Sequence, residues 1–201
     1  MCGIVGYVGM RSAQQVLLDG LEKLEYRGYD SAGVALTQRD GIRVVKSKGR
    51  LSTLRSKLEE LALPQSSCGI GHTRWATHGE PNDINSHPHV SQNGKVALVH
   101  NGIIENYLEI REFLEEKGVQ FTSQTDSEVV AQLLEYCLGL DEVHCMQDAI
   151  YMVLHRIEGA YAFGIVCADD PERIYAARKD APLLLRYGDG CNFTVSYTHL
   201  R

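Results

Sequence analysis

The chain has 201 residues, of which 44% are hydrophobic and 23% charged, values typical of one folded globular domain rather than of a disordered segment. Its formal net charge of −6 argues against a broad basic surface, so no nucleic-acid partner is expected. The longest apolar run, residues 160–168, is too short to cross a membrane, and the first residues lack the pattern of a signal peptide. We therefore expect a cytoplasmic protein without a membrane partner.

Cysteine and histidine spacing gives little support for a metal site. The six cysteines contain no Cys-x-x-Cys pair, and the eight histidines contain one close pair, His87 and His89. Local pairs of ligands at short spacing are typical of zinc sites, so neither a metal nor a cofactor is expected. Free thiols are typical of a reducing compartment.

The chain starts with Met1-Cys2-Gly3, followed by a short apolar run. In one interpretation, residues 3–9 are a buried strand and Cys2 only packs at its end. In the other, removal of Met1 leaves Cys2 with both a thiol and a free α-amine, which can serve as a nucleophile and its base. The first residues alone leave both open.

Hydrophobic periodicity predicts a mixed set of elements after this strand. A helical pattern begins at Ser12 and ends near Arg27-Gly28. The remaining chain predicts strands at 32–37, 42–46, 69–73, 96–99, 160–167, 173–177, 183–187 and 193–195, and helices at 51–61, 104–117, 127–138 and 147–157. Residues 74–94 form a long polar stretch, and loops of that length inside a domain are usually functional. Hairpin-joined strands at both ends favour an α+β fold.

Arg74 and Trp75 follow a predicted strand and open this polar stretch, which also holds Thr77 and His78. An arginine can hold a carboxylate through two parallel hydrogen bonds. The plainer alternative is a surface arginine stacked on the tryptophan.

Asn101-Gly102 follows a predicted strand and has the composition of a tight hairpin turn. Apolar residues downstream recur at helical spacing, which predicts a helix and not a returning strand. The pair would then lie between a strand end and a helix start, where an amide and a backbone N–H can stabilise an oxyanion.

Asp126 lies inside the sequence Thr125-Asp-Ser-Glu128, whose spacing matches a helix capping box. Its carboxylate either favours the helix N-terminus electrostatically or lies at the mouth of a site and binds an ammonium group. The local sequence supports both equally.

Five longer motifs carry a family resemblance: CGIVGY, LEYRGYDSAG, GHTRWATHGEPN, VHNGIIEN and QTDSEVVA. With them the chain resembles, from Cys2 to about residue 195, the N-terminal-nucleophile (class II) glutamine amidotransferases. Within that family the resemblance is to the glutaminase domains of the glutamine–fructose-6-phosphate aminotransferases (isomerizing). It implies an N-terminal-nucleophile hydrolase fold, a four-layer αββα sandwich of mostly antiparallel sheets.

The resemblance also implies a role for each candidate residue. Cys2 would attack the glutamine amide to form a thioester and release ammonia, with its own α-amine as the base. Asn101 and Gly102 would form the oxyanion hole, while Arg74 and Asp126 would bind the α-carboxylate and α-ammonium of glutamine. The other implied positions are Thr77 and His78 in the substrate loop, Trp75 in gating an ammonia channel, and Arg27 near the nucleophile.

The resemblance implies that residues 2–196 are a glutaminase domain, truncated at its C-terminus, and that residues 197–201 do not match the family. The family's isomerase half, which binds fructose 6-phosphate and would carry any oligomeric contacts, is not in the 201 residues. We therefore expect L-glutamine as the substrate, and glucosamine 6-phosphate as the product of the parent enzyme. The alternatives are a stand-alone or differently partnered amidotransferase, and a non-catalytic glutamine-binding module.

Overall fold

The computed structural model describes residues 2–75, 80 and 82–196 of the chain. Its elements follow one another as β1 (Gly3–Gly9), α1 (Ala13–Glu22), the short 3₁₀ turn η1 (Glu25–Arg27), β2 (Ser31–Gln38), β3 (Gly41–Lys48), α2 (Leu51–Leu61), β4 (Cys68–Arg74), β5 (His89–Val90), β6 (Val96–Ile104), α3 (Tyr107–Glu116), α4 (Asp126–Leu138), α5 (Met146–Arg156), β7 (Gly159–Cys167), β8 (Asp170–Lys179), β9 (Leu184–Gly188) and β10 (Cys191–Ser196). Within these ranges, no helix combines the length and the apolar character that crossing a membrane requires.

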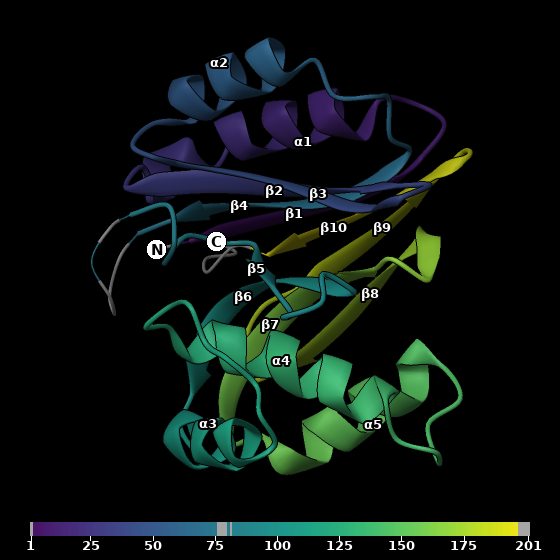
Figure 1. The fold of residues 1–201 in the computed structure, drawn as a ribbon. Helices are drawn as coiled ribbons and strands as arrows, with labels where there is room; N and C mark the ends of the chain where they lie inside the picture. The colour runs from purple at the N-terminus through teal and green to yellow at the C-terminus, as the bar shows by residue number, and fades with distance from the viewer. Residues whose placement is uncertain (1, 76–79, 81, 197–201) are drawn as a thin grey trace.

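Two antiparallel sheets stack face to face between two layers of helices (Figure 1). The first sheet has the strand order β3-β2-β4-β1-β10-β9, and α1 and α2 cover its outer face. The second sheet has the order β5-β6-β7-β8, and α3, α4 and α5 cover its outer face. This arrangement confirms the prediction of an α+β, four-layer αββα sandwich.

Alternation along the strands divides the apolar side chains between three buried layers. In β1, Ile4 packs between the two sheets, while Val5 and Tyr7 pack against the helices of the first layer. In β6, Val99 faces the first sheet, whereas Leu98 packs against α3, α4 and α5. The same two-residue period therefore decides which polar side chains of these strands face the opposite sheet.

Several element boundaries differ from the sequence-based predictions. The helix predicted from Ser12 to near Gly28 ends at Glu22, and the η1 turn follows it. The strand predicted at 96–99 continues to Ile104, so the next helix begins at Tyr107 instead of residue 104. The polar stretch 74–94 contains the short strand β5, which pairs with β6.

The part of this polar stretch that the structure describes is tied to the first sheet by side chains of β3 and α2. Lys46 Nζ donates to the main-chain oxygen of Ser86 at 2.9 Å, and Lys57 Nζ forms an ion pair with Asp83 at 2.9 Å. Gly33 of β2 lies so close to the segment that an added Cβ would overlap the main-chain oxygen of His87. Glycine at position 33 therefore lets the segment lie directly on the sheet.

We predict that Gly33→Ala destabilises the protein by about 1–3 kcal/mol, the usual cost of forcing extra atoms into a packed region. The overlap is with backbone, so no flexible side chain can move away to relieve it. Gly139→Ala is the matched control, because its Cβ would lie no closer than 3.4 Å to any neighbour. It should stay within about 0.5 kcal/mol of wild type. Urea unfolding measures both, and equal stabilities would contradict the close approach.

Candidate active site

Strand pairing places Cys2 at a junction of three strands. In the antiparallel pair of β1 and β4, Gly3 lies opposite Thr73, so the start of β1 meets the end of β4. On its other side β1 pairs with β10, with Ile4 opposite Ser196. Cys2 therefore lies beside Arg74 and Trp75, although more than 70 residues separate them in the sequence.

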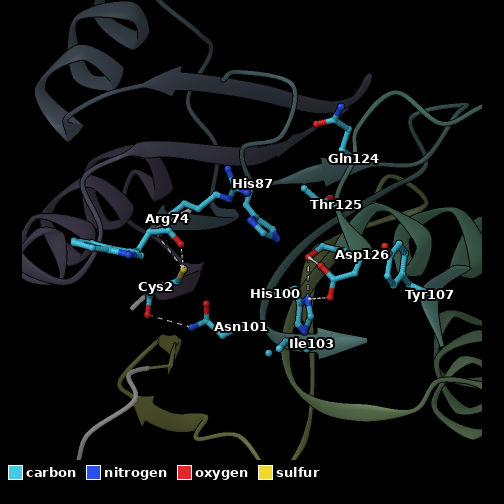
Figure 2. A pocket seen from close by; sticks show the side chains of 13 residues that line it. Cys2, Arg74, His87, His100, Asn101, Ile103, Tyr107, Gln124, Thr125 and Asp126 are labelled. Carbon is cyan, nitrogen blue, oxygen red and sulfur yellow. Dashed lines mark hydrogen bonds and ion pairs between the residues drawn. The ribbon is translucent and has the colours of Figure 1, made fainter. Parts of the chain in front are cut away.

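The Cys2 thiol is held by the backbone of Trp75 (Figure 2). The Trp75 N–H donates to Cys2 Sγ at 3.3 Å, and the Sγ–H group lies 3.6 Å from the Trp75 carbonyl oxygen. Burial raises the pKa of Cys2 above its ordinary value, although the Trp75 N–H and the positive charge of Arg74 partly oppose the rise. The thiol is therefore protonated at neutral pH and needs a base in order to act as a nucleophile.

Arg74 is a buried residue, with only 5% of its surface exposed, so it is not the surface arginine of the alternative interpretation. Arg74 lies four residues after Ile70 in β4, so the two side chains are on the same face of the strand. Ile70 faces the second sheet, and Arg74 therefore does too. Burial lowers its pKa, and Asp30 and Asp126 lie near enough to oppose that shift. Trp75 is 42% exposed and meets Tyr29 edge to face, with ring centroids 5.2 Å apart.

Asn101 and Gly102 lie inside β6, which corrects the prediction that they separate a strand from a helix. They pair with Ala162 and Tyr161 of β7. Asn101 occupies the same face of β6 as Val99 and therefore points at the first sheet, where its Nδ2 donates to the main-chain oxygen of Cys2 at 3.3 Å. Gly102 has a φ of +139°, and an added Cβ would overlap the main-chain oxygen of Ala160. A side chain at position 102 would distort this strand.

Asp126 begins α4, but the predicted capping box is absent from the Thr125–Glu128 segment. Thr125 makes no side-chain cap hydrogen bond, and Glu128 instead accepts hydrogen bonds from the backbone N–H groups of Thr122 and Ser123. Asp126 Oδ2 accepts the Ile104 N–H at 2.8 Å. The Asp126 carboxylate is thereby fixed beside Ile104, the last residue of β6, which follows Asn101 by three residues.

These residues surround one cavity of about 320 Å³. Figure 2 shows Cys2 and Asn101 on one side of it and Asp126 with Tyr107 on the other. The complete lining is Cys2, Arg74, Trp75, His87, His100, Asn101, Gly102, Ile103, Tyr107, Gln124, Thr125, Asp126 and Ser127.

Six predicted site residues thus meet at the cavity: Cys2, Arg74, Trp75, Asn101, Gly102 and Asp126. Thr77 and His78 lie outside the described residues, as does the side chain of Arg27. A guanidinium, a carboxylate, a thiol and a side-chain amide therefore line one space.

Several cavity residues were not predicted, although their neighbours in the sequence gave a signal for them. His100 directly precedes Asn101, while Gln124 and Thr125 directly precede Asp126, so adjacency to a candidate residue could have found them. His87 lies in the polar stretch 74–94, where the predicted site residues are Arg74, Trp75, Thr77 and His78.

Four buried histidines cluster at the cavity: His87 and His100 line it, while His72 and His89 lie against His87. Ring centroids of His72 and His87 are 4.2 Å apart, and those of His87 and His89 are 4.7 Å apart. Burial lowers the pKa of His72 to about 3 and that of His100 to about 4, and it lowers those of His87 and His89 well below the ordinary value. All four rings are neutral at neutral pH.

Comparison with known proteins places the chain in a family. Residues 72–197, more than half of the chain, match the family described as "Glutamine amidotransferase domain". A curated relative from Caldanaerobacter subterraneus subsp. tengcongensis, "Glutamine--fructose-6-phosphate aminotransferase [isomerizing]", is 56% identical over 98% of this chain and 31% of its own length. The protein of the same name from Thermus thermophilus is 52% identical over 98% of this chain and 32% of its own length.

Solved structures agree with the sequence relatives. Glutamine phosphoribosylpyrophosphate amidotransferase from B. subtilis superposes with a TM-score of 0.80 at 28% identity, over 96% of this chain and 41% of its own. A structure described as the allosteric regulatory enzyme of purine biosynthesis superposes with a TM-score of 0.82 at 29% identity, over 97% and 42%. The chain spans about one third of the length of the curated relatives that it matches.

The neutral histidine cluster predicts a loss of stability in mild acid. Each ring binds a proton below about pH 6.5 when the chain is unfolded but stays neutral in the folded protein, so the unfolded state binds more protons. The free energy of unfolding should therefore fall between pH 7 and pH 5, by up to about 1.4 kcal/mol per pH unit for each histidine. Urea unfolding at pH 7, 6 and 5 measures this slope.

The matched variant is His89→Gln, which can keep the hydrogen bond to Thr125 Oγ1 but cannot titrate. It should have a shallower slope than wild type over the same range. A wild-type stability that does not change between pH 7 and pH 5 would contradict the burial of neutral rings.

Proposed function

The chain belongs to the glutamine amidotransferase family, and we propose that it hydrolyses the side-chain amide of glutamine with Cys2 as the nucleophile. The single observation that supports this most strongly is the convergence of Cys2, Arg74, Asn101 and Asp126 on one cavity. They come from four separate parts of the sequence, and together they offer a group for each end of a glutamine molecule.

Arg74 and Asp126 fit the charged end of the substrate. Glutamine is a zwitterion with a neutral amide tail, so a fixed cation and a fixed anion bind its carboxylate and ammonium groups. The planar guanidinium of Arg74 can donate two parallel hydrogen bonds to a carboxylate. The Asp126 carboxylate, 20% exposed, is held by the Ile104 N–H and can accept hydrogen bonds from an ammonium. With both charges bound, the amide tail is left to face Cys2.

Cys2 would carry out the reaction in two steps. Its sulfur attacks the amide carbon as the thiol proton leaves for a base, and collapse of the tetrahedral intermediate expels ammonia and leaves a thioester. Water then hydrolyses the thioester to glutamate and restores the thiol. The base is the α-amine of Cys2, freed by removal of Met1, because an α-amine has an ordinary pKa of about 7.7–8.0 and is partly neutral at physiological pH.

Asn101 and Gly102 would stabilise the negative oxygen of both tetrahedral intermediates. The Asn101 Nδ2 group already points at the Cys2 main chain. The backbone N–H of Gly102, the next residue on the same strand, is the second donor. Donors fixed before the reaction stabilise the developing charge without reorganisation.

Residues 2–196 would act as the glutaminase domain of a larger aminotransferase. The curated relatives are about three times as long as this chain, and their printed names specify fructose 6-phosphate as the acceptor. Ammonia released at Cys2 would therefore pass to fructose 6-phosphate, bound by a sugar-isomerase part beyond these residues, to give glucosamine 6-phosphate. Thr77, His78 and Arg27 would assist glutamine binding, and Trp75, exposed at the cavity, would control the path of ammonia.

An N-terminal extension tests the nucleophile and its base together. We predict that an uncleaved N-terminal tag abolishes glutamate formation, because it converts the α-amine into an amide and fills the space beside the thiol. Cleavage that leaves Cys2 as the first residue should restore activity, and Cys2→Ala should abolish it while glutamine still binds. The measurement is the rate of ammonia release, with each N-terminus verified by mass spectrometry.

Two controls keep this test specific. The same tag at the C-terminus and the variant Cys145→Ala, an exposed cysteine at the start of α5, should both leave the rate unchanged. Full activity with the N-terminal tag intact would refute the α-amine as the base. Full activity of Cys2→Ala would refute the nucleophile.

Arg74→Lys should weaken glutamine use mainly through KM, because lysine keeps the charge but loses the two-pronged hold. The expected loss is on the order of 1–3 kcal/mol, the range of charge-assisted hydrogen bonds. Arg43→Lys, which changes a surface ion pair with Asp40, is the matched control and should alter neither KM nor kcat. An unchanged KM in Arg74→Lys would remove Arg74 from the substrate site.

A further inference from the structure

The Asn101 side chain is held by groups from three different strands or strand ends. Its Oδ1 lies 3.0 Å from Nε2 of His72 in β4. Its Nδ2 donates to the main-chain oxygen of Cys2 at 3.3 Å and to Ser196 Oγ at 3.2 Å. His72 and Ser196 are both completely buried, and neither lines the cavity.

The surroundings of His72 determine which of its ring nitrogens carries the proton. Nε2 also lies 3.2 Å from the main-chain oxygen of His100, and a carbonyl oxygen can only accept a hydrogen bond. Nε2 must therefore carry the proton and donate it. Nδ1 of the same ring has no hydrogen-bond partner among the described residues, so it can remain unprotonated.

An Nε2–H donor permits only one orientation of the neighbouring amide. With Oδ1 toward His72, both ends of the Asn101 amide form hydrogen bonds. If the amide were rotated by half a turn, its NH₂ group would meet the His72 N–H, and its oxygen would meet the Cys2 carbonyl oxygen. Two like pairs in a buried site are costly, because an unsatisfied buried polar group costs about 1–3 kcal/mol.

We propose that His72 is a positioning residue for the reaction, whose Nε2–H group fixes the Asn101 amide so that its NH₂ group faces Cys2. This inference rests on the proposed function, because the amide must face Cys2 only if an oxyanion forms there. His72 itself does not touch the substrate cavity and acts entirely through Asn101.

Ser196 completes the arrangement on the other side of the amide. Its Oγ donates to the main-chain oxygen of Pro182 at 2.6 Å, so its own proton is committed and its lone pairs accept from Asn101. The second Asn101 hydrogen goes to the Cys2 carbonyl at 3.3 Å, longer than the usual 2.9–3.0 Å. That weaker hydrogen bond is the one that a negatively charged oxygen would replace.

Burial of His72 keeps this donor in one form. A protonated ring would donate from both nitrogens and place a positive charge near Arg74, which the low pKa of His72, about 3, prevents at neutral pH. The hydrogen-bond pattern around Asn101 is therefore constant over the pH range in which the Cys2 chemistry would operate.

The test is a double-variant cycle on the full-length protein, with glutamate formation as the assay. Asn101→Ala should lower kcat about 10²–10³-fold, the usual effect of removing an oxyanion donor. His72→Leu should lower kcat about 10–100-fold, by analogy with residues that orient metal ligands through hydrogen bonds, with little change in KM. Because His72 acts through Asn101, the double variant should be no slower than Asn101→Ala alone.

Two further variants separate positioning from general stability. His72→Gln places an amide donor near the position of Nε2 and should recover most of the lost kcat. His89→Gln alters a buried histidine that is hydrogen-bonded to Thr125 and not to Asn101, so any effect it has should add to that of Asn101→Ala.

A measurement on the unmutated protein covers the case in which His72→Leu does not fold. ¹⁵N NMR of labelled histidines should show the His72 ring as the neutral Nε2–H form, with the signal assigned by its loss in His72→Gln. An Nδ1–H form would overturn the proposal, and so would full additivity of His72→Leu with Asn101→Ala in an active protein. An inactive wild-type protein with a verified Cys2 N-terminus would overturn the proposed function as well.

Discussion

The antiparallel pairing of β1 with β4 is the constraint on which the site depends. It brings the first residues of the described chain against the end of a strand more than 60 residues away, so the Cys2 thiol lies against the backbone of Trp75 and beside Arg74. A slip of one residue in this register would turn Arg74 and His72 from the space between the sheets toward the helices. The hydrogen bonds of one strand pair therefore set the position of both the thiol and the buried cation.

Stacking of the two sheets supplies the other half of the site. Asn101 reaches the first sheet because it shares a face of β6 with Val99, which packs in the layer between the sheets. The adjacent His100 points the opposite way, and its Nδ1 lies 2.8 Å from Ser127 Oγ in α4. Two neighbouring residues thus connect the site to two different layers, and the apolar packing of each layer holds them in place.

Burial sets the charge state of this region. The four clustered histidines are neutral, whereas Arg74 keeps its charge and lies near the carboxylates of Asp30 and Asp126. Neutral rings can hold an amide such as that of Asn101 without adding a second positive charge beside the guanidinium of Arg74. The cost is a fold that should lose stability when those rings can bind protons only by unfolding.

The sequence alone determined the α+β class, the positions of most helices and strands, and the candidate residues, because periodicity and the long motifs are local. It could not determine that the strand containing Asn101 and Gly102 continues to Ile104, because the hydrogen bonds that extend it come from β7, about 60 residues later. Nor could it identify His72, which looks like one more strand residue until β4 and β6 face each other. Tertiary structure decided these features, since sheet pairing and stacking join residues that no local pattern connects.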